Sequence, residues 1–297
     1  MVLFTAILML CAALFLLRSE WEKLQLTAEH YEIRTKKLKK GERYRIVFFS
    51  DLHRYFPAKC DQEKILKAME AENPDAVVIG GDMLCVSKKN GTVTDTASAL
   101  SLIRRIAEKY PVFYGEGNHE TRLQENSPEE YADYVTELLS YGVRYLSDTA
   151  VPLSEHICIA GASLDGKYYR KLSPGFGKKV PLDPGYFEAK SLFRDSAAVN
   201  IMLVHSPLYL EEAAKAGADL VLSGHMHGGT IRLPGGCGLM TPQFQFLEKR
   251  CSGLHRCGDT AMIVTRGLGT HSVRIRFNNL PELSVADIEG YDGETDL

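Results

Sequence analysis

The sequence contains no Cys-x-x-Cys pair, although seven cysteines are scattered along its 297 residues. An odd number of dispersed cysteines in a chain of this length argues against a disulfide framework and against a structural zinc knuckle. Cys251 and Cys257 are close enough in sequence for a disulfide to be considered. Reduced and partly buried thiols are the simpler expectation for all seven.

The sequence also lacks an excess of basic residues, since its formal net charge is -3 and its pI is about 6.3. This balance disfavours a polyanion-binding surface, so we do not expect nucleic acid as a partner. No Pro- or Ser-rich linker and no internal repeat divides the chain. An apolar share of 45% is enough for a sizeable core. One domain is therefore the simplest organisation of the soluble part.

The first 17 residues differ from the rest, because no charged side chain occurs between Met1 and Leu17. This run is at the short end of what a helix needs to cross a bilayer. Arg18 and Trp21 follow it where interfacial anchors are expected. We expect an uncleaved membrane anchor over residues 1–20. A cleaved signal peptide is the alternative, but a basic leading region and a clear small-residue cleavage site are both missing.

The side of the membrane stays open at this point. Basic residues after the anchor would favour a cytoplasmic position, but long domains cross membranes largely regardless of charge. Residues 21–43 read as a polar stalk with one strand near His30–Arg34, and residues 44–297 read as the folded domain.

Short apolar runs alternate with amphipathic stretches from residue 44 onward. Strands are expected at 44–49, 76–79, 112–114, 143–146, 156–160, 200–204 and 219–222, and helices at 61–72, 97–109, 128–140 and 208–215. The last third, 230–288, is rich in strands and turns. The alternation of expected strands and helices, followed by a β-rich end, predicts an α/β domain with mixed sheets.

Residues 165–185 form a long irregular stretch with aromatic, basic, Pro and Gly residues. Such a stretch inside a compact domain is usually functional or disordered. One interpretation is a mobile surface loop. The other is a flap facing the substrate, with Lys167, Arg170 or Lys171 meeting an anionic group.

Five short polar patterns each follow an expected strand. They are Asp51-Leu52-His53, Gly80-Gly81-Asp82, Gly117-Asn118-His119-Glu120, His205 and Gly224-His225-Met226-His227. Loops at the carboxyl ends of strands converge on one edge of an α/β sheet, so these residues should meet in one crevice. Any one of the patterns is weak evidence, because a lone histidine or a Gly-Asp pair is usually structural. The whole set in this order is hard to ascribe to chance.

The residue types in these patterns suit divalent metals. Imidazole and carboxylate ligands together favour zinc, iron or manganese over calcium. A carboxylate such as Asp82 has two oxygens and can bridge two cations. Two metals about 3.5–4 Å apart can polarise a phosphoryl group and activate water. His30, His156, His255 and His271 fall outside the patterns, and we expect them to be structural.

This order of motifs resembles the calcineurin-like metallophosphoesterase superfamily over roughly residues 45–277. The segments GHMHGGTIRLPGGCGLMTPQ and GLGTHSVRIRFNNLPELSVADI look most like its membrane-associated bacterial branch, which includes lipid-related and cell-wall-related phosphoesterases. The resemblance implies an α/β (α+β) fold, a four-layer sandwich of two mixed β-sheets flanked by helices. It also favours an extracytoplasmic catalytic domain.

The resemblance further implies roles for single residues. One metal is expected on Asp51, His53, Asp82 and His227, and the second on Asp82, Asn118, His205 and His225. Asp82 would bridge two divalent ions of manganese, iron or zinc. His119 would not bind metal but would act as the general acid on the leaving group, as imidazole suits this task. Glu120 is expected to orient His119.

One departure narrows the expected activity. Purple acid phosphatases of the same superfamily carry Asp-x-Gly and a tyrosine ligand, whereas His53 and Cys85 occupy those places here. We therefore expect a two-metal hydrolase of phosphoester or pyrophosphate bonds that uses a metal-bridging hydroxide. Its substrate would be a phosphorylated small molecule or a lipid-linked phosphate. The alternatives are a catalytically silent, membrane-tethered metal-binding scaffold of the same fold and, less favoured, a protein phosphatase or nuclease on the cytosolic face.

Overall fold

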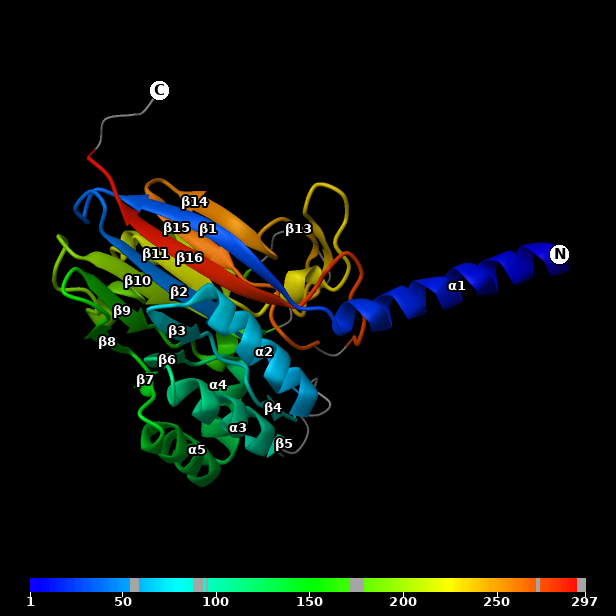
Figure 1. The fold of residues 1–297 in the computed structure, drawn as a ribbon, viewed down its shortest axis with the longest axis horizontal. Coiled ribbons are helices and arrows are strands. Elements are labelled where there is room, and N and C mark those ends of the chain that lie inside the picture. Colours follow the sequence, from blue (N-terminus) through cyan, green and yellow to red (C-terminus); the bar gives the residue numbers. More distant parts are fainter. Residues whose placement is uncertain (54–58, 88–92, 95, 171–178, 271–272, 293–297) are drawn as a thin grey trace.

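The computed structural model describes all residues except 54–58, 88–92, 95, 171–178, 271–272 and 293–297. Two six-stranded sheets pack face to face, and helices cover them (Figure 1). The sheets are mixed, with parallel strands in the middle and an antiparallel strand near or at an edge. This architecture confirms the fold expected from the sequence.

The first sheet has the order β1-β16-β2-β3-β6-β7. Its strands are β1 (Thr27–Thr35), β16 (Glu282–Gly290), β2 (Arg43–Phe49), β3 (Ala76–Ile79), β6 (Val112–Gly115) and β7 (Arg144–Leu146). Strands β2, β3, β6 and β7 run parallel, which brings their carboxyl ends to one edge of the sheet.

The second sheet has the order β14-β15-β11-β10-β9-β8. Its strands are β14 (Gly253–Cys257), β15 (Thr260–Val264), β11 (Leu220–Ser223), β10 (Val199–Leu203), β9 (Ile157–Gly161) and β8 (Thr149–Pro152). The four central strands are parallel. Two short hairpins complete the β-structure, namely β4 (Cys85–Val86) with β5 (Val93–Thr94) and β12 (Gly238–Met240) with β13 (Phe246–Glu248).

Alternation along the strands explains why the sheets are buried on both faces. On β2, Ile46 and Phe48 join the core between the sheets, while Val47 and Phe49 face the helices. Successive side chains of a strand point to opposite faces, so each strand supplies both layers. Ile201 and Leu222 meet the same inner core from the second sheet.

The outer layers are made by helices. Helices α2 (Lys59–Glu72), α3 (Thr96–Ala107), α4 (Asn118–Asn126) and α5 (Pro128–Ser140) lie beside the first sheet, and α6 (Leu210–Lys215) packs on the second (Figure 1). The sequence pattern did not predict the helix α4, nor the strands β4, β5 and β8. The first residues of α4 belong to the polar motif Gly117-Asn118-His119-Glu120.

The helix α1 (Val2–Lys23) extends away from the sandwich as a rod (Figure 1). It is the one described helix that is long and apolar enough to cross a membrane, and almost all of its apolar part is exposed. A signal sequence has the same features. The strand β1 pairs with β16 over residues 27–35, so the segment expected as a stalk supplies an edge strand of the first sheet.

The described cysteines are free thiols, as the sequence predicts. They include Cys251 and Cys257.

Candidate metal centre

All five polar patterns lie directly after strands and meet at one edge of the sandwich. The first sheet supplies Asp51 and His53 after β2, Asp82 after β3 and Asn118 after β6; the second supplies His205 after β10 and His225 and His227 after β11. Parallel strands bring their carboxyl ends together, and face-to-face packing then joins the two sets of loops. We call these seven residues the metal-ligand set. All seven are buried.

Three groups of described residues have ligand atoms that could hold a cation, and the first of them consists of Asp51, His53 and His227. Another consists of His53, Cys85 and His119. The Nε2 atoms of His53 and His227 lie 3.1 Å apart. His227 Nε2 is 3.3 Å from Asp51 Oδ1, and His53 Nε2 is 3.7 Å from the same oxygen. Three potential ligand atoms thus converge on one point, where a divalent cation would satisfy all of them.

Asp82, His205 and His225 form the second cluster. His205 Nε2 lies 3.3 Å from Asp82 Oδ2, and His53 Nε2 lies 3.7 Å from the same oxygen. Asp82 Oδ2 therefore faces both clusters. A shared carboxylate between two cation sites is the arrangement that a binuclear centre requires.

The side-chain amide of Asn118 completes the second cluster. Its oxygen faces His225 Nδ1 at 2.7 Å and Asp82 Oδ2 at 3.3 Å, positions at which an amide nitrogen would make hydrogen bonds. A cation between these atoms would explain why the oxygen points inward. His205 Nε2 is also buried without a hydrogen bond. The residues present therefore fit a pair of divalent metals, and their nitrogen and oxygen atoms suit zinc, iron or manganese.

Most of the metal-ligand set has a strained backbone. Positive φ angles occur at Asp51 (57°), His53 (48°), Asp82 (53°), His225 (68°) and His227 (49°). Such conformations cost roughly 1–3 kcal/mol each in residues other than glycine and gather at functional sites. The loops hold these side chains toward the centre at the expense of local stability.

Two glycines allow the loops to approach each other. A Cβ on Gly117 would lie 2.3 Å from Asp82 Oδ1, and a Cβ on Gly224 would lie 2.4 Å from Asp51 Oδ2. Both contacts are far inside van der Waals distance. Any side chain at either position would push a metal-ligand carboxylate aside.

Hydrogen bonds to backbone carbonyls set the ring orientation of two histidines. His205 Nδ1 lies 2.6 Å from the carbonyl oxygen of Gly80, and His227 Nδ1 lies 3.3 Å from that of Gly269. A carbonyl only accepts, so Nδ1 carries the proton in both rings. Each Nε2 lone pair is then left to face the centre, as metal-binding histidines commonly arrange.

His119 stands at the first turn of α4 and has the opposite tautomer. The backbone N–H of Val86 donates to His119 Nδ1 at 2.7 Å, which places the proton of the neutral ring on Nε2. The His119 ring lies 4.9 Å from that of His53. A proton donor is thus held beside the centre, at a helix N-terminus that favours anions.

The expected role of Glu120 was wrong. Its two carboxylate oxygens accept four hydrogen bonds, from the backbone N–H groups of Asp82, Met83 and Gly117 and from the Tyr114 hydroxyl. Four is the usual capacity of a carboxylate, so none is left for His119. Glu120 instead ties the Asp82 loop to the start of α4.

Opposite charges shift the pKa values of the buried groups strongly. Burial by itself raises the pKa of Asp51, but His227 and His205 hold it well below its usual range. Burial lowers the pKa of His205, yet Asp82 and Asp51 raise it to about 9. The pKa of His53 is likewise raised, to about 10, by Asp51, Cys85 and Asp82 against burial. Metal binding would displace protons held in this way.

A cavity of about 280 Å³ adjoins the centre, because Asn118 lines it together with Arg122, Lys167, Tyr169 and Arg170. The Tyr169 ring packs 5.1 Å from that of His225, so residues 166–169 of the expected loop lie against the metal centre. Lys167 and Arg170 of the expected flap therefore line this cavity. Lys171, the third residue expected there, lies outside the described residues. Sequence reasoning missed Arg122, although it lies one helical turn after Asn118.

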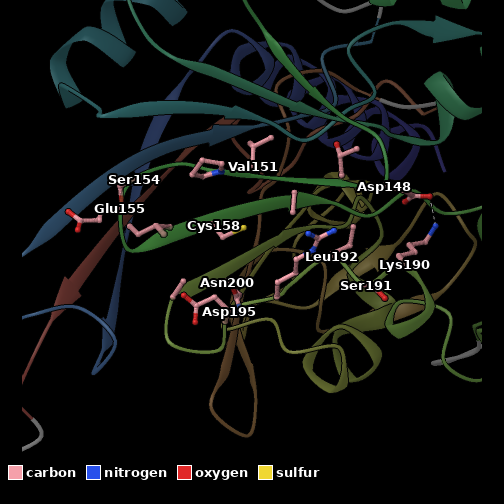
Figure 2. Close-up of a pocket in the computed structure, with 16 residues that line it drawn as sticks. Asp148, Val151, Ser154, Glu155, Cys158, Lys190, Ser191, Leu192, Asp195 and Asn200 are labelled. Atoms are coloured by element: carbon pink, nitrogen blue, oxygen red, sulfur yellow. Dashed lines mark hydrogen bonds and ion pairs between the residues drawn. The ribbon is translucent and has the colours of Figure 1, made fainter.

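A larger cavity, of about 610 Å³, lies between β8, β9 and residues 190–198 (Figure 2). None of the metal-ligand set lines it. Lys190 at its rim is paired with Asp148 at the end of a loop. Its size exceeds that of the cavity near the metal centre, but it contains no comparable group of reactive side chains among the described residues.

The sequence is similar to those of known proteins. The calcineurin-like phosphoesterase family matches residues 44–229. An uncharacterized metallophosphoesterase of Aquifex aeolicus (strain VF5) is 30% identical over 277 residues, which cover 92% of this chain and 95% of that protein. The uncharacterized metallophosphoesterase YkuE of Bacillus subtilis (strain 168) is 27% identical and covers 82% of this chain and 78% of its own. The phosphodiesterase YaeI of Escherichia coli (strain K12) is 25% identical, with 82% of each chain covered. The family match over residues 44–229 and the Aquifex relative along nearly the whole chain show that this protein belongs to the calcineurin-like phosphoesterases.

Proposed function

We propose that this protein hydrolyses phosphoester or pyrophosphate bonds with two divalent cations and water. The observation that carries this proposal is the pair of Asp/His clusters that share Asp82 Oδ2 at one edge of the sandwich. Two cations held there would neutralise phosphoryl oxygens and lower the pKa of a water molecule. Asp51, His53, Asp82 and His227 would hold one cation, and Asp82, Asn118, His205 and His225 the other.

The chain itself supplies the proton for the leaving group. In this proposal, a water molecule loses a proton to solvent and attacks phosphorus as hydroxide. The bond from phosphorus to the leaving oxygen breaks, that oxygen takes the proton of His119 Nε2, and His119 regains a proton from solvent. Val86 supports this role because its N–H keeps the proton off Nδ1. The N-terminus of α4 adds positive potential where the phosphoryl group would lie.

The substrate would be a phosphorylated small molecule or a lipid-linked phosphate. Arg122 and Arg170 line the cavity beside Asn118, and Glu125 also lines it. Arginine suits such a place because its planar group recognises phosphate and carboxylate. The apolar helix α1 favours a protein anchored at a membrane, where lipid-linked substrates are found.

The proposal is tested on the full chain purified in detergent. The protein would be freed of metal with a chelator and assayed with manganese, zinc or iron on a chromogenic phosphomonoester, a chromogenic phosphodiester and a pyrophosphate diester. We expect turnover of at least one substrate that appears only with added metal. The Asp82→Asn protein should bind less metal and lose turnover, because it lacks the charge shared by the two clusters.

A matched control is Asp292→Asn, which removes an exposed carboxylate paired with Lys40 beyond the end of β16. This variant should keep its activity. If the wild-type protein binds two metals but turns over none of the three substrate classes, the silent metal-binding scaffold is the better description.

A further inference from the structure

The last turn of α1 is built into the catalytic domain, although the rest of the helix is exposed. Ser19 and Glu22 are 1% and 0% exposed. The Phe15 ring also stacks on that of Phe277, with centroids 4.8 Å apart. A helix that served only as a tether would have no need to bury a carboxylate at its end, since burial of a charge is costly unless it is well hydrogen-bonded.

The Glu22 carboxylate holds the backbone before β16. Its Oε1 and Oε2 accept hydrogen bonds from the N–H groups of Asn278 at 3.0 Å and Asn279 at 2.9 Å, and Arg18 Nε donates to Oε1 at 2.7 Å. Charge-assisted hydrogen bonds of this kind are stronger than neutral ones. The end of α1 therefore fixes the position of Asn279.

Asn279 in turn holds a metal ligand. Its side chain is fully buried, and its Nδ2 donates to the carbonyl oxygen of His227 at 2.8 Å. The packing is tight, because a Cβ added to Gly228 would lie 2.0 Å from Asn279 Oδ1. The backbone of His227 is left-handed and needs such support.

A second connection reaches the His227 ring. Ser19 Oγ accepts a hydrogen bond from the backbone N–H of Arg276 at 3.0 Å. The buried Arg276 guanidinium donates to the carbonyl oxygens of Gly267 and Gly269, and the latter also faces His227 Nδ1. The same segment reaches Asp51, since the N–H of Gly269 donates to the Asp51 carbonyl at 2.7 Å.

We propose that the end of α1 positions the first metal cluster, with Glu22 and Asn279 as its positioning residues. Glu22 sets Asn279, Asn279 sets the His227 backbone, and Ser19 with Arg276 sets the carbonyl that orients the His227 ring. The inference rests on the proposed role of Asp51, His53 and His227 as ligands. It requires that α1 stay attached, because cleavage before Trp21 would remove Ser19.

The test measures metal binding in the full chain in detergent micelles, by calorimetric titration of the chelator-treated protein with manganese. We expect wild-type protein to bind two equivalents. Asn279→Ala and Glu22→Ala should weaken one of the two by roughly 10–100-fold, the usual effect of losing a group that supports a metal ligand. Glu22→Gln should lie between them and wild type, because its amide keeps one acceptor for two N–H groups.

The matched control is Glu20→Gln, which changes an exposed carboxylate on the same turn of α1. It should bind both equivalents as wild type does. Thermal unfolding of each metal-free variant separates positioning from folding. If Asn279→Ala and Glu22→Ala bind both equivalents normally, or if both sites weaken equally along with the stability of the metal-free protein, the inference is wrong. A protein that binds metal as described but hydrolyses nothing would overturn the proposed function and leave this inference standing.

Discussion

At the scale of single residues, His53 and His119 show how neighbouring imidazoles can differ in chemistry. His53 faces Asp51 and Asp82, and these carboxylates together with Cys85 raise its pKa to about 10 although burial lowers it. The backbone N–H of Val86 donates to His119 Nδ1 and so fixes the tautomer of that ring. In the proposed mechanism, the groups around each ring, rather than the residue type, make His53 a metal ligand and His119 a proton donor.

Replacing His119 tests its proposed role as the general acid. His119→Ala should lower turnover by roughly 10²–10⁴-fold, the usual contribution of a general acid. Both metals should stay bound, because His119 is not part of the metal-ligand set. Activity assays together with metal analysis of the purified variant measure both effects. The loss should be smaller for a substrate whose leaving group needs no proton, such as a nitrophenolate. Normal turnover of an alkyl ester would exclude His119 as the acid.

At the scale of elements, β16 is joined to the neighbouring β2 by charge as well as by backbone pairing. Asp287 on β16 lies 2.7 Å from both Arg43 and Arg45 on the neighbouring β2. Burial by itself raises the pKa of Asp287, but Arg45 and Arg43 hold it below its usual range. The depressed pKa means that the folded protein prefers the charged carboxylate.

This pair of contacts predicts a pH-dependent stability. Asp287→Asn should lower the free energy of unfolding by about 1 kcal/mol at pH 7, since the pairs are partly exposed. The contribution is present above the unfolded pKa of about 3.9 and is lost as pH falls through the lower folded value. Denaturant unfolding at pH 7 and near pH 3 should therefore show the difference between variant and wild type shrink. Glu289→Gln, which removes a more exposed partner of Arg43, is the control and should change stability little. An unchanged difference at low pH would contradict this account.

At the scale of the whole molecule, the metal centre joins the two sheets. Asp51 and Asp82 come from loops of the first sheet, whereas His205 and His227 come from the second. Without cations, buried carboxylates and imidazoles must balance one another across the interface. With cations, the same atoms connect both halves of the sandwich through shared ligands.

Metal removal should therefore lower the stability of the entire domain. A ligand present at about 100 times its dissociation constant stabilises the folded state by about 2.7 kcal/mol. The unfolding temperature should fall by several degrees on chelation and recover when manganese is added back. Differential scanning calorimetry measures this change. Asp82→Asn should show a much smaller shift between the two conditions. Equal unfolding temperatures with and without metal in the wild-type protein would mean that the centre does not connect the sheets.

The sequence by itself determined much of this protein. Strand periodicity placed β2, β3, β6, β10 and β11, and the motifs after them identified the metal-ligand set, because local propensity and motif spacing are properties of short segments. The five patterns resembled one family as a set, and the family match and relatives bear that out. The motif also predicted that Glu120 orients His119, because a motif relates only residues that are close in sequence.

Tertiary structure alone decided which groups surround these residues. Three contacts join positions between 37 and 257 residues apart, namely those of Glu120 with the Asp82 loop, of Glu22 with Asn279, and of Asn279 with His227. No spacing rule relates such positions, because they become neighbours only when two sheets pack and a helix end is buried between loops. The sequence thus predicted seven residues that the structure brings together at one edge of the sandwich, where they could hold metal. Their strained backbones, their tautomers and their link to α1 follow from packing.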